Sequence, residues 1–85
     1  MTPEQLVALR SVPLGTMPNK VRLARNMLGL KQGDVATAIG LTNPQVSDIE
    51  RGDYKDVPLE KSRLVAEFFG CPIEDLFPAR ERVSA

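Results

Sequence analysis

The chain has 85 residues, 42% of them hydrophobic, which suffices for one small domain with a single core. It contains no histidine, the usual general base and commonest metal ligand, and a single cysteine, which leaves no metal-ligand spacing and no intrachain disulfide. The longest apolar run covers residues 6–9, far short of a membrane span. We therefore expect a cytoplasmic protein that is not an enzyme, does not enter a membrane and binds no metal or other cofactor.

The net charge is zero, with eleven basic and eleven acidic residues. This balance argues mildly against a nucleic-acid partner, because affinity for phosphates comes largely from Lys and Arg. The charges are nevertheless unevenly distributed. Residues 20–55 hold six basic and four acidic side chains, whereas residues 56–82 hold four basic and six acidic ones. The first region is therefore weakly basic.

Residues 1–17 predict a short helix and a linker. Thr2 supplies a capping hydroxyl, a proline follows in the first turn, and Gln5 completes the pattern of a capped helix start. We expect this helix over about 3–10. The following residues, 11–17, contain a proline and a glycine and predict a linker.

The main helical domain is expected over residues 18–78, followed by a flexible tail over 79–85. The second helix of the chain begins at Pro18. Apolar residues then recur at helical spacing until Gly29, which ends the helix in a C-cap position.

Two short amphipathic helices, over about 32–39 and 43–51, surround the sequence Ile39-Gly40-Leu41-Thr42. The stretch Thr42-Asn43-Pro44-Gln45 has the form of a capping box with a proline in the first turn. Two helices this short bury little between themselves. Their glycine-marked connection predicts a helix-turn-helix, whose second helix is exposed to read a DNA groove. The apolar positions expected in its core are Val35, Ala36, Ile39, Val46 and Ile49.

A polar loop leads to a fifth helix that ends at Gly70, and a short sixth helix covers about 72–77. Asp56 or Val57 is expected to cap the fifth helix, with Pro58 in its first turn. The lone Cys71 is interpreted as a small buried filler. The chain is therefore predicted to be all-α.

Four stretches carry a family resemblance. They are Leu28-Gly29-Leu30-Lys31-Gln32 after Arg25, Val35-Ala36 with Ile39-Gly40-Leu41-Thr42, Val46-Ser47-Asp48-Ile49-Glu50-Arg51-Gly52, and the run from Leu59 through Phe69-Gly70-Cys71-Pro72-Ile73 to Phe77. In this order and spacing, residues 19–77 resemble the Cro and phage-repressor family of helix-turn-helix domains, also called XRE-like. The resemblance implies a lambda-repressor-like domain of five helices, here with an extra short N-terminal helix.

The resemblance also implies which residues meet DNA. On the recognition helix, base contacts are expected from Asn43, Pro44, Gln45 and Asp48. Phosphate contacts are expected from Lys31, Gln32, Thr42, Ser47, Arg51, Tyr54 and Lys55. Arg25 and Glu50 resemble the family's structural ion pair, which orients the recognition helix.

The side chains expected at the bases differ in chemistry. The amides of Asn43 and Gln45 suit a bidentate contact with adenine, and local capping is the alternative for Gln45. Pro44 offers only an apolar surface, suited to a thymine methyl group. A carboxylate is repelled by phosphates, so Asp48 either accepts from a cytosine amine, rejects other bases, or faces a neighbouring basic side chain.

An apolar pair on the fifth helix, Leu64 and Phe68, lies off the main apolar stripe and needs a cover. Either the N-terminal extension folds over it, through Leu6, Leu9 and Leu14, or a second subunit packs there. We favour a homodimer, because two-fold symmetry places two recognition helices about one DNA turn apart. The expected interface comprises Leu64, Phe68, Ile73 and Phe77.

We therefore expect a sequence-specific transcriptional regulator of bacterial or phage type, a repressor, whose partner is double-stranded DNA. No small-molecule ligand is expected, so control would come from protein level, proteolysis or a second regulatory protein. Phage regulators, restriction-modification controllers and antitoxins share this size and fold, and the subclass stays open. The alternative is a protein-interaction module or antitoxin of the same fold whose main partner is another protein, which the zero net charge favours.

Overall fold

The computed structural model describes residues 1–55 and 57–78, and in this part of the chain it contains six helices and no strand. The helices are α1 Pro3–Ser11, α2 Val21–Met27, α3 Gln32–Ile39, α4 Asn43–Glu50, α5 Leu59–Phe69 and α6 Ile73–Leu76. The all-α prediction is confirmed. No described helix is long and apolar enough to cross a membrane. The predicted tail over 79–85 lies outside the described residues.

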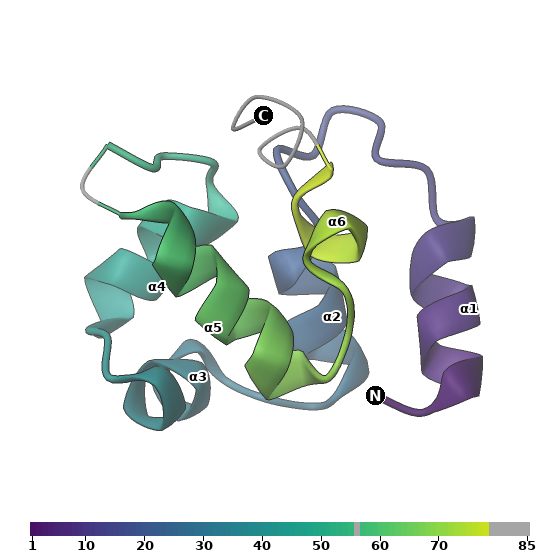
Figure 1. Cartoon of the computed structure of the whole chain (residues 1–85), viewed down its shortest axis with the longest axis horizontal. Coiled ribbons are helices and arrows are strands. Elements are labelled where there is room, and N and C mark those ends of the chain that lie inside the picture. Colours follow the sequence, from purple (N-terminus) through teal and green to yellow (C-terminus); the bar gives the residue numbers. More distant parts are fainter. Residues whose placement is uncertain (56, 79–85) are drawn as a thin grey trace.

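α5 runs through the middle of the molecule, with α3 and α4 on one side and α6, α2 and α1 on the other (Figure 1). Helix contacts join α3 to both α4 and α5, α5 to α6, and α2 to both α1 and α4. All six helices contribute to one core, which consists of Leu9, Val21, Ala24, Val35, Ala36, Val46, Ile49, Val57, Val65, Ala66, Phe69, Leu76 and Phe77. The predicted core positions of the helix-turn-helix are among them, except that Ile39 is only partly buried.

Two threonines cap their helices in the same way. At α1, the Thr2 hydroxyl accepts from the Gln5 N–H at 3.2 Å and the Gln5 side chain accepts from the Thr2 N–H at 2.9 Å. Thr42 and Gln45 make the same reciprocal contacts at α4, at 3.3 and 2.9 Å. Each capping box satisfies N–H groups that a helix start otherwise leaves unpaired, as the sequence predicts.

Two helices begin later than the sequence predicts. α2 starts at Val21 rather than Pro18, because the Asn19 side chain accepts from the Val21 N–H at 3.0 Å and holds the preceding residues in a turn. α5 starts at Leu59, and Pro58 is its N-cap rather than part of its first turn, since its ψ of 153° is extended.

α1 is fastened to the rest of the domain through both apolar and polar contacts. The Leu9 side chain is fully buried in the core, and the Leu9 carbonyl accepts from the Lys20 ammonium at 2.8 Å. A cation in this position also interacts favourably with the negative end of the α1 dipole. At the surface, Arg10 forms an ion pair with Asp75 at 2.9 Å. Lys20 is therefore buried beside α1 and adds nothing to the basic character of the predicted binding region.

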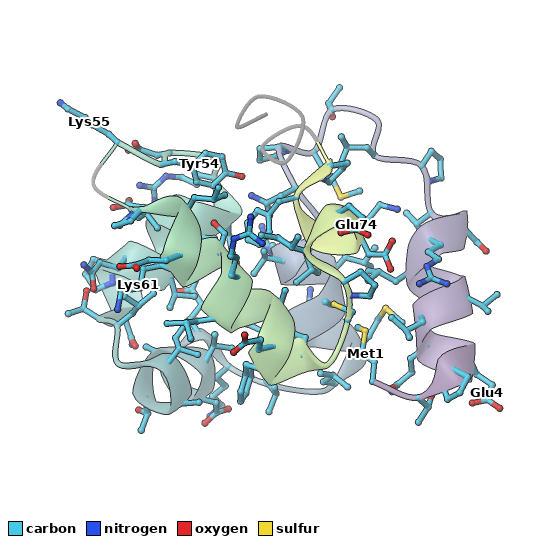
Figure 2. All side chains as sticks on the ribbon, viewed as in Figure 1. Met1, Glu4, Tyr54, Lys55, Lys61 and Glu74 are labelled. Carbon is cyan, nitrogen blue, oxygen red and sulfur yellow. The ribbon has the colours of Figure 1, made fainter. Side chains whose placement is uncertain are left out.

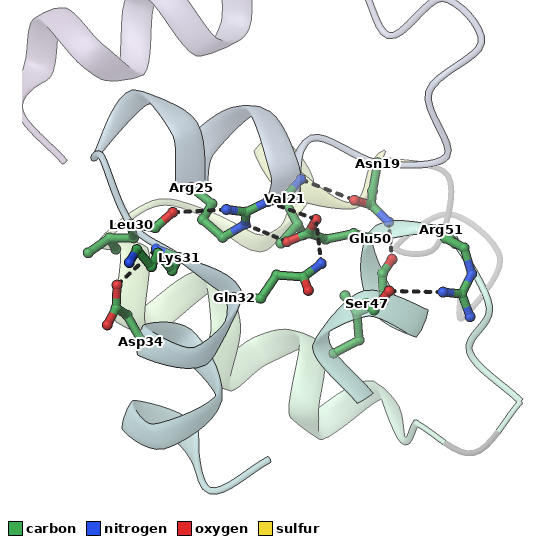
Figure 3. Close-up of polar contacts among 11 residues, drawn as sticks. Asn19, Val21, Arg25, Leu30, Lys31, Gln32, Asp34, Ser47, Glu50 and Arg51 are labelled. Atoms are coloured by element: carbon green, nitrogen blue, oxygen red, sulfur yellow. Dashed lines mark hydrogen bonds and ion pairs between the residues drawn. The ribbon is translucent and has the colours of Figure 1, made fainter. Parts of the chain in front are cut away.

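A nearly buried ion pair holds α4 against α2. Arg25 Nε donates to one carboxylate oxygen of Glu50 at 2.7 Å, and Arg25 Nη2 donates to the other at 3.3 Å (Figure 3). The two side chains are only 13% and 5% exposed. Arg25 Nη1 also donates to the Leu30 carbonyl at 2.9 Å, just before α3. This two-pronged contact fixes the orientation of α4 relative to α2 and to the turn that enters α3.

One core position is polar. Ser62 lies on the buried side of α5 with no exposed surface, and its hydroxyl has no hydrogen-bond partner in the described part of the chain. A buried hydroxyl without a partner loses its hydration and gains nothing in return. Ser62 therefore weakens the core.

Replacing Ser62 with Ala removes the unpaired hydroxyl and improves helix propensity. We expect Ser62→Ala to raise the free energy of unfolding by about 1 kcal/mol, measured by urea denaturation. Ser11→Ala is the matched control, because the Ser11 hydroxyl is exposed and donates to the Val7 carbonyl at 2.7 Å. A loss of stability in Ser62→Ala would show that the hydroxyl has a partner.

Replacing Glu50 with Gln keeps the shape of the side chain and leaves the Arg25 guanidinium without a counter-ion. We expect Glu50→Gln to lower the free energy of unfolding by about 3 kcal/mol, because the remaining charge is nearly buried. Arg10→Gln, which breaks the surface pair with Asp75, should cost less than about 1 kcal/mol. Similar small losses in both variants would contradict a structural role for the buried pair.

Candidate nucleic-acid interface

One side of α2, the start of α3 and the outer side of α4 surround a shallow hollow of about 740 Å³. Its lining includes five of the residues predicted to meet bases or phosphates, which are Lys31, Gln32, Asn43, Ser47 and Arg51. Arg22, from α2, adds a basic side chain that the resemblance does not single out. The hollow is therefore polar and open, and four basic side chains line it, namely Arg22, Arg25, Lys31 and Arg51.

The start of α4 presents the side chains predicted to read bases. Asn43 and Pro44 are exposed, whereas Gln45 is half-buried. The Gln45 side-chain oxygen accepts from the Thr42 N–H. Gln45 therefore takes part in capping α4, which was the alternative to a base contact. Asn43 lies against the start of α3, where a Cβ on Gly33 would come within 3.5 Å of the Asn43 side-chain oxygen. A Cβ at position 33 would therefore make an ordinary van der Waals contact with Asn43, so the two helix starts lie side by side.

Gln32 is fixed in place by the buried ion pair. Its Nε2 donates to Glu50 Oε1 at 3.3 Å, so one carboxylate binds both Arg25 and Gln32 (Figure 3). At the same end of α3, the Asp34 carboxylate accepts from the Lys31 N–H at 2.8 Å. This contact caps a helix that lacks a Ser or Thr at its start. Both contacts hold the first turn of α3 beside the hollow.

Asp48 and Arg51 lie one turn apart on α4 and its C-cap, and their side chains form an ion pair. Arg51 Nη1 also donates to the Ser47 hydroxyl at 2.9 Å (Figure 3). The structure thus realises the alternative in which Asp48 faces a neighbouring basic side chain. Both members of the pair remain accessible, with 61% of the Arg51 side chain and 34% of the Asp48 side chain exposed.

The loop after α4 is anchored by Asn19, a residue that the sequence reasoning missed. Asn19 Nδ2 donates to the Ile49 carbonyl at 2.6 Å and to the Tyr54 hydroxyl at 2.7 Å. The Tyr54 ring packs edge-on against Phe77, with ring centroids 6.1 Å apart. Lys55 extends outward beyond this anchored loop (Figure 2). The only local signal for Asn19 is an asparagine two residues before a helix, which is typical of a side-chain turn.

The apolar pair on α5 stays uncovered. Leu64 and Phe68 are each 38% exposed and border a groove of about 390 Å³ between α5 and the end of α3. The N-terminal extension does not cover them, because α1 packs against α2 on the other side of α5 (Figure 1). Of the other residues predicted at a dimer interface, Ile73 is partly buried and Phe77 is fully buried. Phe77 is therefore a core residue and offers no surface to a partner.

Cys71 is half-buried, and burial together with the nearby Asp75 raises the pKa of its thiol to about 11. The thiol is therefore protonated at neutral pH and a weak nucleophile. In the part of the chain that the structure describes, no three His, Cys, Asp or Glu side chains gather where they could hold a metal ion.

Comparison with known proteins agrees with this architecture. The helix-turn-helix family matches residues 21–76, which spans α2 to α6. An uncharacterized HTH-type transcriptional regulator from Methanocaldococcus jannaschii is 38% identical over 61 residues, which cover 72% of this chain and 91% of that protein. No solved structure matches the chain significantly. The chain therefore belongs to the helix-turn-helix family of XRE type.

Proposed function

We propose that this protein is a sequence-specific transcription regulator that represses its targets by placing α4 in the major groove of DNA. The family and the archaeal relative support a DNA-binding regulator of transcription. The observation that carries the proposal is the way α4 is mounted. Its back is fixed by the Arg25–Glu50 pair, while Asn43 and Pro44 project from the exposed start of the helix.

The proposed interface divides into two parts. Asn43, Pro44, Gln45 and Asp48 face base edges. Around them, phosphate contacts come from Lys31, Gln32, Thr42, Ser47, Arg51, Tyr54 and Lys55. Contacts to phosphates fix the register of a protein on the duplex, and contacts to bases supply the specificity. Arg22 joins the phosphate group in this proposal because it lines the same hollow.

Asn43 tests the base-reading part of the proposal. We expect Asn43→Ala to weaken binding to a selected duplex by about 1–3 kcal/mol and binding to random duplex much less, because only the selected site offers its base partner. Fluorescence anisotropy with labelled duplexes measures both affinities. Asn26→Ala, an exposed asparagine of α2 that does not line the hollow, is the matched control. Equal losses of affinity for the two duplexes would show that Asn43 does not read a base.

We further propose that the protein acts as a homodimer through the α3–α5 groove that Leu64 and Phe68 border. Two observations support this. An apolar pair beside a groove is a surface that association would bury. In addition, the zero net charge makes a single recognition unit weak on DNA, and two-fold symmetry doubles its contacts.

The dimer proposal predicts association that depends on protein concentration. Wild-type protein should sediment as a dimer at tens of micromolar. Phe68→Glu should sediment as a monomer, because the dimer would bury the new carboxylate without a partner. Val7→Glu is the control, since Val7 is 61% exposed on α1, away from α5. A monomeric wild type would exclude this interface.

The same groove favours a second candidate function, in which the main partner is another protein, such as a second regulatory protein or a toxin. Salt distinguishes the two functions. Binding to DNA falls steeply as salt rises, because bound counterions are released, whereas an apolar protein contact is nearly insensitive to salt.

A further inference from the structure

The exposed side of α4 carries an internal charge pair at the place where a DNA-binding helix needs free cations. Arg51 binds Asp48 through Nη2 and Ser47 through Nη1, so both terminal nitrogens of the guanidinium are engaged by α4 itself. Arg51 and Ser47 line the hollow beside α3, and Asp48 is half-buried on the same helix. The pair therefore lies inside the proposed DNA interface.

This arrangement sets up a competition for Arg51. A backbone phosphate and the Asp48 carboxylate are both anions that bind a guanidinium, so a phosphate that reaches Arg51 Nη2 competes with Asp48 for this nitrogen. On a duplex of arbitrary sequence, a phosphate must displace Asp48 and then tolerate its uncompensated charge nearby. The pair should therefore suppress binding to phosphates alone.

A base that offers an amine changes the outcome. In the major groove, cytosine N4 and adenine N6 are donors, whereas guanine O6 and N7 and thymine O4 are acceptors that repel a carboxylate. When Asp48 accepts from an amine, its charge is compensated by the base. Arg51 is then released to a phosphate.

We propose that Asp48 is a specificity-determining residue that acts through Arg51. Asp48 keeps Arg51 from the DNA backbone until a cytosine or adenine amine replaces Arg51 as the hydrogen-bond donor to Asp48. This inference rests on the proposed function, since it describes how the same interface distinguishes a selected site from other DNA. Arg51 then contacts a phosphate only when Asp48 is bound to a base, and Asp48 binds only a base that offers an amine.

The test measures binding to a selected duplex and to random duplex over a range of salt concentrations. It compares the wild type with Asp48→Asn, Arg51→Gln and the double variant. We expect Asp48→Asn to tighten binding to random duplex about tenfold and to steepen the slope of log K against log salt by about one, because one more phosphate contact forms. Its preference for cytosine or adenine at one position of the selected site should fall about tenfold.

The double variant isolates the role of Arg51. In the Arg51→Gln background, adding Asp48→Asn should leave the salt slope unchanged, because the cation for which Asp48 and a phosphate compete is absent. Asp53→Asn is the matched control: it removes the same charge just after α4, where the Asp53 carboxylate accepts from the Lys55 N–H. Any gain in affinity for random duplex from Asp53→Asn should be the same in the wild-type and the Arg51→Gln background.

Three results would overturn the inference. They are an unchanged salt slope in Asp48→Asn, a gain that persists in the Arg51→Gln background, and an unchanged base preference. A wild-type protein that binds neither duplex would instead overturn the proposed function. All the substituted side chains lie at the surface or are half-buried, so we expect each variant to fold, and its circular dichroism spectrum is to be compared with that of the wild type first.

Discussion

The arrangement of the interface depends on one nearly buried carboxylate. Glu50 binds the Arg25 guanidinium on α2 and the Gln32 amide at the start of α3, so three helices meet at a single side chain. Desolvating such a charge is costly unless every partner is present. This cost disfavours other orientations of α4, because a rotation of the helix would separate the Glu50 carboxylate from its partners. The hollow owes its shape to this constraint, since its lining comes from the same three helices.

α4 is held at both ends by different chemistry. Its start is closed by the Thr42–Gln45 capping box, and the carbonyl of Ile49 near its end accepts from the buried Asn19 side chain. Only a narrow outer strip of the helix is left for recognition. On that strip the one basic side chain, Arg51, is bound to an acid of the same helix. α4 is thus anchored at both ends, and the two charged side chains on its outer strip neutralise each other.

Features set by neighbouring residues could be predicted from the sequence, and features set by distant contacts could not. The capping boxes at Thr2 and Thr42 are local patterns, and both occur in the structure. The start of α2 depends on Asn19, and the burial of Phe77 depends on how α6 packs, which no local pattern encodes. Five of the residues that line the hollow were expected at the DNA interface from the family resemblance, whereas Arg22 was not. The resemblance gave no hint that Lys20 would be drawn away to α1.

The attachment of α1 has a consequence for how this part of the chain can change. Lys20 binds a main-chain oxygen of α1, an acceptor that every residue type provides. Of the side chains of α1, only Leu9 is fully buried. The helix can therefore accept many substitutions and still dock in the same place. Because α1 also precedes the residues matched by the helix-turn-helix family, it is a segment in which relatives can diverge without disturbing the DNA-binding core.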